Sequence, residues 1–252
     1  MKKIFITLSV CFAIIFSAAA QNFIDKGEIE FEVKTNVKKT LGNSSWAEML
    51  KDQMPTFRTG YYRFTFADNK SVYKWHHWDE KDKMPEWFRK SDEDNIWYLD
   101  HTANRYSMQK NGFGTIFNIE DSIRNIQWKL SNESRVIAGF NCRKATGVIM
   151  DSVYVFAFFT EEIMISGGPC SINGLPGMIL GLTIPRLYTS FIATKINVNG
   201  INEAAIKPVS VKKPYTYSGL RSVLLQRMSE EGGGDDPDQN QWKNQFVWGV
   251  ML

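Results

Sequence analysis

Residues 27–39 read GEIEFEVKTNVKK, and this stretch decides the fold class. Apolar side chains at Ile29, Phe31 and Val33 alternate with charged side chains. A period of two is typical of a strand with one buried and one exposed face. Further strands are predicted at 61–66, 71–78, 95–99, 105–109, 115–119, 126–130, 135–138, 141–150, 152–159, 178–184 and 188–198.

The stretch at 152–159 indicates how these strands are arranged. Apolar side chains fill both of its faces, so we place it at the centre of a sheet, covered on both sides. We predict a mostly β protein: one antiparallel meander, strongly curved into an open or half-closed barrel. One short early helix is expected around Trp46 to Met54, ending at Pro55, and one late helix over 218–231.

Length and composition set the class of protein and its division. With 252 residues, 43% hydrophobic and 23% charged, the chain is an ordinary globular protein rather than a disordered, collagen-like or coiled-coil one. We predict a signal peptide at 1–20, a β domain at 21–200, and a linker, helix and tail at 201–252 associated with the same domain.

The first twenty residues have the pattern of a signal peptide. Lys2 and Lys3 precede an apolar run from Ile4 to Phe16, and small residues up to Ala20 suit cleavage there. The run is shorter than the roughly 20 residues of a transmembrane anchor, so none is predicted. Without this segment, 28 basic residues (30 − 2) face 27 acidic ones. This near-neutral balance argues against nucleic acid as a partner. We expect an exported protein of the periplasm or outer envelope.

Two cysteines, Cys142 and Cys170, remain after removal of Cys11 with the signal peptide. Disulfides persist in exported proteins, so we predict that these two are paired. Their spacing is far from C-x-x-C, and no histidine cluster lies beside either in sequence. A redox or zinc role is therefore the minor alternative.

A glycine- and proline-rich segment over 166–182 carries the most distinctive motif. Gly174-Leu175-Pro176-Gly177-Met178-Ile179 resembles the signature of the GLPGLI family of exported proteins from Bacteroidota-type bacteria, with Met178 at the position of the usual leucine. The stretches 137–145 and 155–163 resemble the family's preceding strands. The resemblance implies an exported, mainly β protein from a family with no established activity. It supplies no catalytic residues.

Catalytic and metal chemistry find little support in the sequence. His76 and His77 are adjacent on a predicted strand, where neighbours point to opposite faces, so one metal cannot easily take both. No Gly-x-Ser-x-Gly elbow occurs in a convincing setting. We predict no catalytic residue, metal or cofactor, and interpret Gly174, Leu175, Pro176 and Gly177 as a structural corner.

Aromatic side chains are the best candidates for ligand binding. The predicted groove for an apolar or flat-ringed ligand is bordered by Tyr62, Phe64, Phe66, Tyr73, Trp75 and Trp97. The leading functional hypothesis is a non-catalytic envelope protein that binds such a small ligand or an outer-membrane partner. The alternative is a periplasmic hydrolase centred on the glycine-rich loop with His76 or His77.

Overall fold

The computed structural model describes residues 23–252 except 43–44, 113, 211–212 and 231–236. The predicted signal peptide at 1–20 therefore lies outside the described residues, as does residue 231 at the end of the predicted late helix. None of the helices in the described part of the chain is long and apolar enough to cross a membrane.

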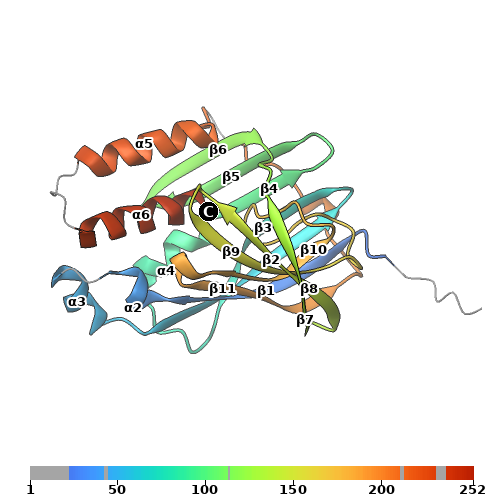
Figure 1. The fold of residues 1–252 in the computed structure, drawn as a ribbon, viewed down its shortest axis with the longest axis horizontal. Helices are drawn as coiled ribbons and strands as arrows, with labels where there is room; N and C mark the ends of the chain where they lie inside the picture. Colours follow the sequence, from blue (N-terminus) through green and yellow to red (C-terminus); the bar gives the residue numbers. More distant parts are fainter. Residues whose placement is uncertain (1–22, 43–44, 113, 211–212, 231–236) are drawn as a thin grey trace, which may run out of the picture.

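In the described part of the chain, eleven strands form one antiparallel sheet in the order β6-β5-β4-β3-β2-β1-β11-β10-β9-β8-β7 (Figure 1). This confirms the predicted β meander, and the sheet is not closed. The strands are β1 (Gly27–Asn36), β2 (Phe57–Ala67), β3 (Lys70–Trp78), β4 (Ile96–Asp100), β5 (Arg105–Gly112), β6 (Thr115–Ser122), β7 (Trp128–Ile137), β8 (Phe140–Ile149), β9 (Val153–Thr160), β10 (Met178–Ile184) and β11 (Thr189–Asn197).

The sheet is strongly rolled, as its connections require. Its two edge strands, β6 and β7, follow one another in the chain and are joined only by residues 123–127. Eleven strands laid flat would be about 48 Å wide, whereas this connection spans at most about 20 Å. The two edges must therefore lie much closer together than in a flat sheet.

The concave face of the roll holds the core. In β1, Ile29 and Phe31 are buried while Glu30 between them is half-buried on the outer face. Strand β9 differs from the prediction, because only one of its faces is covered. Val153 and its alternate neighbours are buried, but Tyr154 is 58% exposed. The other two rings on this outer face, Phe156 and Phe158, are covered by cationic side chains. Lys144 lies 5.9 Å from the Phe156 centroid, and Arg135 lies 5.4 Å from the Phe158 centroid.

Helices gather at one end of the rolled sheet (Figure 1). They are α2 (Val37–Thr40), α3 (Ser45–Lys51), α4 (Glu86–Glu93), α5 (Tyr217–Glu230) and α6 (Pro237–Met251), with 3-10 turns at Pro185–Leu187 and Glu203–Ala205. The elements α3 and α5 match the two predicted helices, whereas α2, α4 and α6 were not predicted. The predicted first strand ran to residue 39, but β1 ends at Asn36 and α2 begins at Val37. Leu220, Leu224 and Met228 of α5 belong to the same hydrophobic core as the sheet.

Candidate functional site

A cavity of about 560 Å³ lies at the helical end of the rolled sheet. Its volume is within the range of small-molecule sites. The apolar and aromatic residues that line it are Val33, Val37, Leu41, Tyr62, Tyr73, Phe88, Trp97, Leu187, Phe191, Phe246, Val250 and Leu252. The polar and charged residues that line it, with Cys170, are Thr35, Thr40, Arg58, Ser91, Asp92, Lys110, Asn111, Thr189 and Gln245.

Three aromatic rings in a row form part of the wall: Tyr62 stacks on Tyr73, and Trp97 is tilted by 52° against Tyr73. Tyr73 stands between Tyr62 and Trp97, with centroid distances of 5.2 Å and 5.3 Å. The strand register produces this row, because Tyr73 and Trp97 are direct partners across β3 and β4. The Trp97 indole N–H donates to the Leu252 carbonyl at 2.8 Å, which fixes the ring and ties down the residue that follows α6.

Lys110 is the unusual residue of the cavity. On β5 it continues the inward alternation of Tyr106 and Met108, which are both buried in the core. Its ammonium nitrogen lies 4.9 Å from the Trp97 ring centroid. No carboxylate of the described residues lies within 4.0 Å of that nitrogen. Burial lowers the pKa of Lys110; Asp92 and Cys170 raise it and Arg58 lowers it. The Lys110 ammonium therefore has N–H donors that no described residue accepts.

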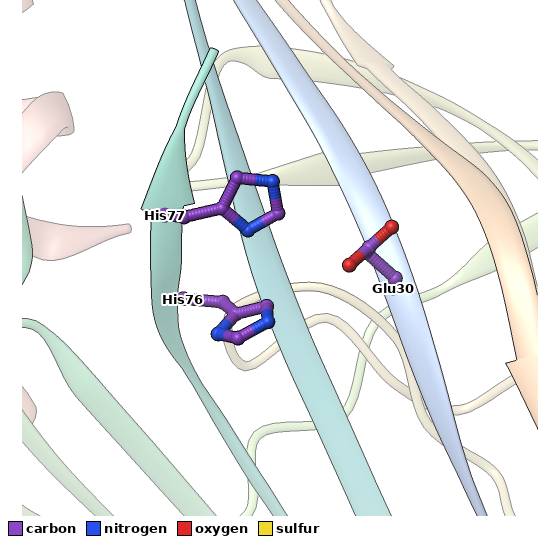
Figure 2. Close-up of side chains that lie close together, drawn as sticks. All are labelled: Glu30, His76 and His77. Carbon is purple, nitrogen blue, oxygen red and sulfur yellow. The ribbon is translucent and has the colours of Figure 1, made fainter. Parts of the chain in front are cut away.

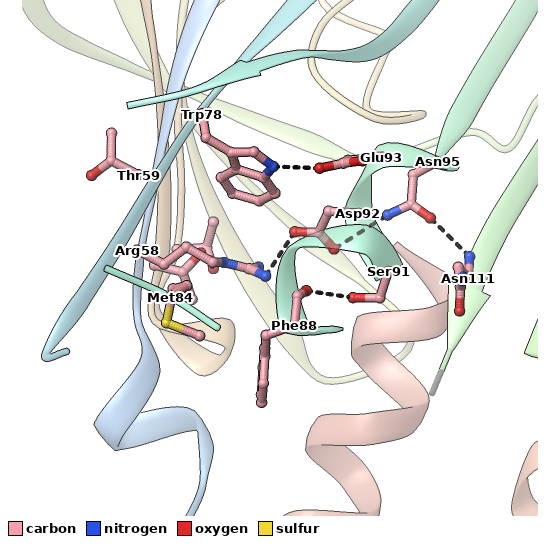
Figure 3. Close-up of polar contacts among 12 residues, drawn as sticks. Arg58, Thr59, Trp78, Met84, Phe88, Ser91, Asp92, Glu93, Asn95 and Asn111 are labelled. Carbon is pink, nitrogen blue, oxygen red and sulfur yellow. Dashed lines mark hydrogen bonds and ion pairs between the residues drawn. The ribbon is translucent and has the colours of Figure 1, made fainter. Parts of the chain in front are cut away.

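The second cation of the cavity is already neutralised. Arg58 of β2 and Asp92 of α4 form an ion pair of 2.8 Å, with side chains only 19% and 16% exposed (Figure 3). The amide of Asn95 adds a 3.4 Å contact to the same carboxylate. Among the described residues that line the cavity, Asp92 is the one carboxylate, and two cations share it: it pairs with Arg58 and acts on Lys110 only through its charge.

Two further polar groups border the cavity near Lys110. Tyr73 is 1% exposed, and its hydroxyl has no hydrogen-bond partner among the described residues. Burial raises the pKa of the Cys170 thiol to about 12, with Lys110 acting in the opposite direction, so the thiol is protonated at neutral pH. Cys170 also has a positive φ of 57°, in the turn closed by the Ile172 N–H and the Pro169 carbonyl.

The predicted disulfide is wrong, because Cys142 and Cys170 are both free, buried thiols. They lie in different surroundings. The Cys142 thiol is on β8 and donates to the Phe140 carbonyl at 3.5 Å, whereas Cys170 borders the cavity beside Lys110 and Tyr73. Burial raises the pKa of Cys142 to about 11. The disulfide was predicted from the number of cysteines alone, which says nothing of the distance between them. In the fold, the two thiols lie in different parts of the molecule.

The six aromatic residues of the predicted groove divide into two groups. Tyr62, Tyr73 and Trp97 line the cavity. Phe64 and Phe66 are 1% and 0% exposed within the packed core, so they border no groove. Trp75 is partly buried against the same core, and its indole N–H has no hydrogen-bond partner among the described residues. The structure therefore has, in place of the predicted groove, a cavity that is lined by three of the six residues.

The segment Gly174-Leu175-Pro176-Gly177 makes a tight corner before β10. Gly174 and Gly177 have φ of 93° and 129°, and Leu175 is buried. The Gly177 N–H donates to the Leu175 carbonyl at 2.8 Å, which closes a turn around Pro176. Nearby, the Trp128 indole N–H donates to the Asn173 carbonyl at 2.9 Å. The buried Leu175 side chain and the Trp128 hydrogen bond therefore attach this corner to the core and to β7.

Lys110 and Asp92 were missed as site residues, although part of the signal was available. The predicted strand over 105–109 ended three residues before β5 does, and one residue before Lys110. Its alternation places Tyr106 and Met108 inward, and one more step places a lysine on an apolar face. Asp92 gave no comparable signal, because the short helix that carries it was not predicted.

Comparisons with known proteins bear only on the fold. No family model and no curated protein matches the chain. The structure of PNGF-II in one of its two crystal forms is similar, with a TM-score of 0.50 and 14% identity over 76% of this chain and 32% of that one. This chain thus spans about a third of the PNGF-II chain, and the likeness concerns the fold alone. An uncharacterised conserved protein from Thermus thermophilus has a TM-score of 0.38 and 7% identity, over 81% of this chain and 97% of that one.

Proposed function

We propose that the protein is a non-catalytic binding protein whose ligand has an apolar or aromatic body and an anionic group. The observation that carries this proposal is the ammonium of Lys110, which faces a largely apolar cavity without a carboxylate partner among the described residues. A charge in such a place is costly unless it is paired. An anionic ligand would supply the missing partner.

The surroundings of Lys110 fit the two parts of such a ligand. The anion would accept from the ammonium of Lys110, which lines the cavity. Charge-assisted bonds of this kind are the stronger ones in proteins. The body of the ligand would lie against the aromatic row of Tyr62, Tyr73 and Trp97, where flat rings stack favourably.

Cellular location and family belong to the same proposal. The signal-peptide pattern at 1–20 supports export to the periplasm or outer envelope, and the Gly174-Leu175-Pro176-Gly177 corner supports membership of the GLPGLI family. A cavity of about 560 Å³ favours a small ligand over an outer-membrane partner as the bound species. The hydrolase alternative gains no support from His76 and His77, because neither lines the cavity.

A fluorescence titration with 1-anilinonaphthalene-8-sulfonate, an aromatic anion, tests this proposal. We expect one saturable site per chain. Gly249 of α6 lines the cavity, and a Cβ placed there would meet no atom within 4 Å. Gly249→Phe should therefore fill the cavity and abolish binding, whereas Gly249→Ala should bind like the wild type. Both variants should melt at or above the wild-type temperature, since glycine is a poor helix former. Undiminished binding by Gly249→Phe would place the probe elsewhere and contradict the proposal.

A further inference from the structure

His76 and His77 lie on the same face of the sheet, contrary to the sequence-based expectation. In the register of β2 and β3, Tyr61 pairs with His77 and Tyr62 pairs with Trp75, so His76 is an extra residue in a β-bulge. The bulge interrupts the strict alternation of side chains. Figure 2 shows both imidazoles pointing from β3 toward Glu30 of β1.

The three side chains form a compact cluster. One ligand atom from each of Glu30, His76 and His77 lies within 4.8 Å of the others. Three ligands of a tetrahedral zinc ion lie about 3.4 Å apart when the bonds are about 2.0–2.1 Å long. Small rotations of the exposed His77 ring and of the Glu30 carboxylate can supply the difference, because neither is held in a packed core.

Neighbouring groups orient the cluster. The His77 ring stacks on Tyr61 with centroids 4.5 Å apart and planes 10° apart. The Tyr61 hydroxyl donates to Glu32 at 3.3 Å, and the Thr194 hydroxyl donates to the Glu30 carboxylate at 3.4 Å. Outer groups of this kind position the ligands in metal sites.

Arg63 already places a positive group at one of the two His76 ring nitrogens that could bind a metal. Its guanidinium nitrogen lies 2.7 Å from Nε2 of His76. Because a guanidinium can only donate, this Nε2 must be an acceptor whose lone pair is directed at Arg63. A metal ion bound at Nε2 would need the same lone pair. Arg63 has a second partner in Glu28, at 3.2 Å, to which it can turn when it releases His76.

We propose that Glu30, His76 and His77 bind a zinc ion on the outer face of the sheet, in competition with the Arg63 guanidinium. Two imidazoles and one carboxylate are an established zinc ligand set, which leaves a fourth position for water. The site is independent of the cavity, because the cavity residues Tyr62 and Tyr73 point to the opposite, inner face.

Histidine-selective NMR of the purified protein tests the proposal directly, because the chain has only three histidines. Titration with zinc chloride should shift the ring signals of His76 and His77 and leave that of His101 unchanged. Magnesium chloride should shift none, because magnesium prefers oxygen ligands. If zinc shifts none of the signals at millimolar concentration, or shifts His101 equally, the proposal is wrong.

Calorimetric zinc titration of variants supplies the second measurement. His77→Asn and Glu30→Gln should each weaken binding at least about tenfold. Arg63→Gln should tighten it severalfold by removing the competing cation, whereas His101→Gln should leave it unchanged. Melting temperatures establish that each variant is folded. Equal zinc affinity in the wild type, His77→Asn and Glu30→Gln would mean adventitious binding and overturn the assignment.

Discussion

Gly177 has the strictest conformational requirement in the corner before β10. Its φ of 129° is in the region that favours glycine, and a Cβ there would overlap the carbonyl oxygen of Thr160 at the end of β9. Gly200 also has a positive φ, of 67°, but a Cβ there would meet no atom within 4 Å. An added Cβ would therefore cause both backbone strain and a steric overlap at Gly177, but only backbone strain at Gly200.

Substitution of these glycines by alanine should have unequal effects. Gly177→Ala should lower the free energy of unfolding by about 3 kcal/mol or more, because strain and overlap add. Gly200→Ala should lower it by only about 1 kcal/mol, from strain alone. Urea denaturation gives both values. Equal losses would mean that the corner has room for a side chain and that its motif has some other role.

At the scale of elements, α4 shows how an unpredicted helix builds the site. The ion pair between Asp92 and Arg58 joins α4 to β2, and the hydrogen bond of 2.8 Å from the Trp78 indole to Glu93 joins it to β3 (Figure 3). A second ion pair on α4, Glu86 with Lys90 at 3.0 Å, is 78% and 69% exposed. The helix thus carries a buried and an exposed pair for comparison.

Breaking these two pairs should have very different consequences. Asp92→Asn leaves Arg58 without a counter-ion in a mostly buried place, and we expect a loss of about 3 kcal/mol in the free energy of unfolding. Lys90→Met removes a fully solvated partner and should cause no measurable loss. Chemical denaturation of both variants makes the comparison. A similar loss in the two would show that the buried pair does not anchor α4.

Most strands could be predicted from the sequence, because apolar and polar side chains alternate in a strand that has one buried and one exposed face. The predicted strands at 27–39, 71–78 and 178–184 correspond to β1, β3 and β10. The helix α4 was missed because it has only eight residues. The helix α6 was missed because its residues were assigned to the tail that follows the late helix. The bulge at His76 was not predictable, since it depends on which residue of β2 lies opposite.

At the scale of the whole molecule, the rolled sheet brings together residues that are distant in sequence. Thr35 of β1 and Thr189 of β11 share a hydrogen bond of 3.0 Å beside the cavity, although 154 positions separate them. Lys110 and Leu252 meet the same cavity from β5 and the end of α6. Sequence patterns indicate which side chains face inward, but they do not say where the core leaves space.

Without a bound ligand, the wild-type protein should be less stable than a variant that lacks the Lys110 ammonium. Because the pKa of Lys110 is lowered in the folded state, the unfolded chain binds more protons in the pH range between that lowered value and 10.5. Stability of the empty protein should therefore rise with pH through that range. Lys110→Met should stabilise the protein at pH 7 by about 1 kcal/mol, and the gain should disappear above pH 10.5, where both states are neutral. Thermal unfolding across pH measures this; a destabilised Lys110→Met variant at pH 7 would mean that the ammonium is already paired.

The central claim is that Lys110 pairs with an anionic group on the ligand. The most direct measurement compares 1-anilinonaphthalene-8-sulfonate with N-phenyl-1-naphthylamine, which has the same rings without the sulfonate, on the wild type and Lys110→Met. The ratio of the two dissociation constants cancels the contribution of the rings. A charge-assisted hydrogen bond of about 1.5–3 kcal/mol predicts that Lys110→Met shifts this ratio about 10- to 100-fold against the sulfonate. A ratio that is the same in both proteins would contradict the account.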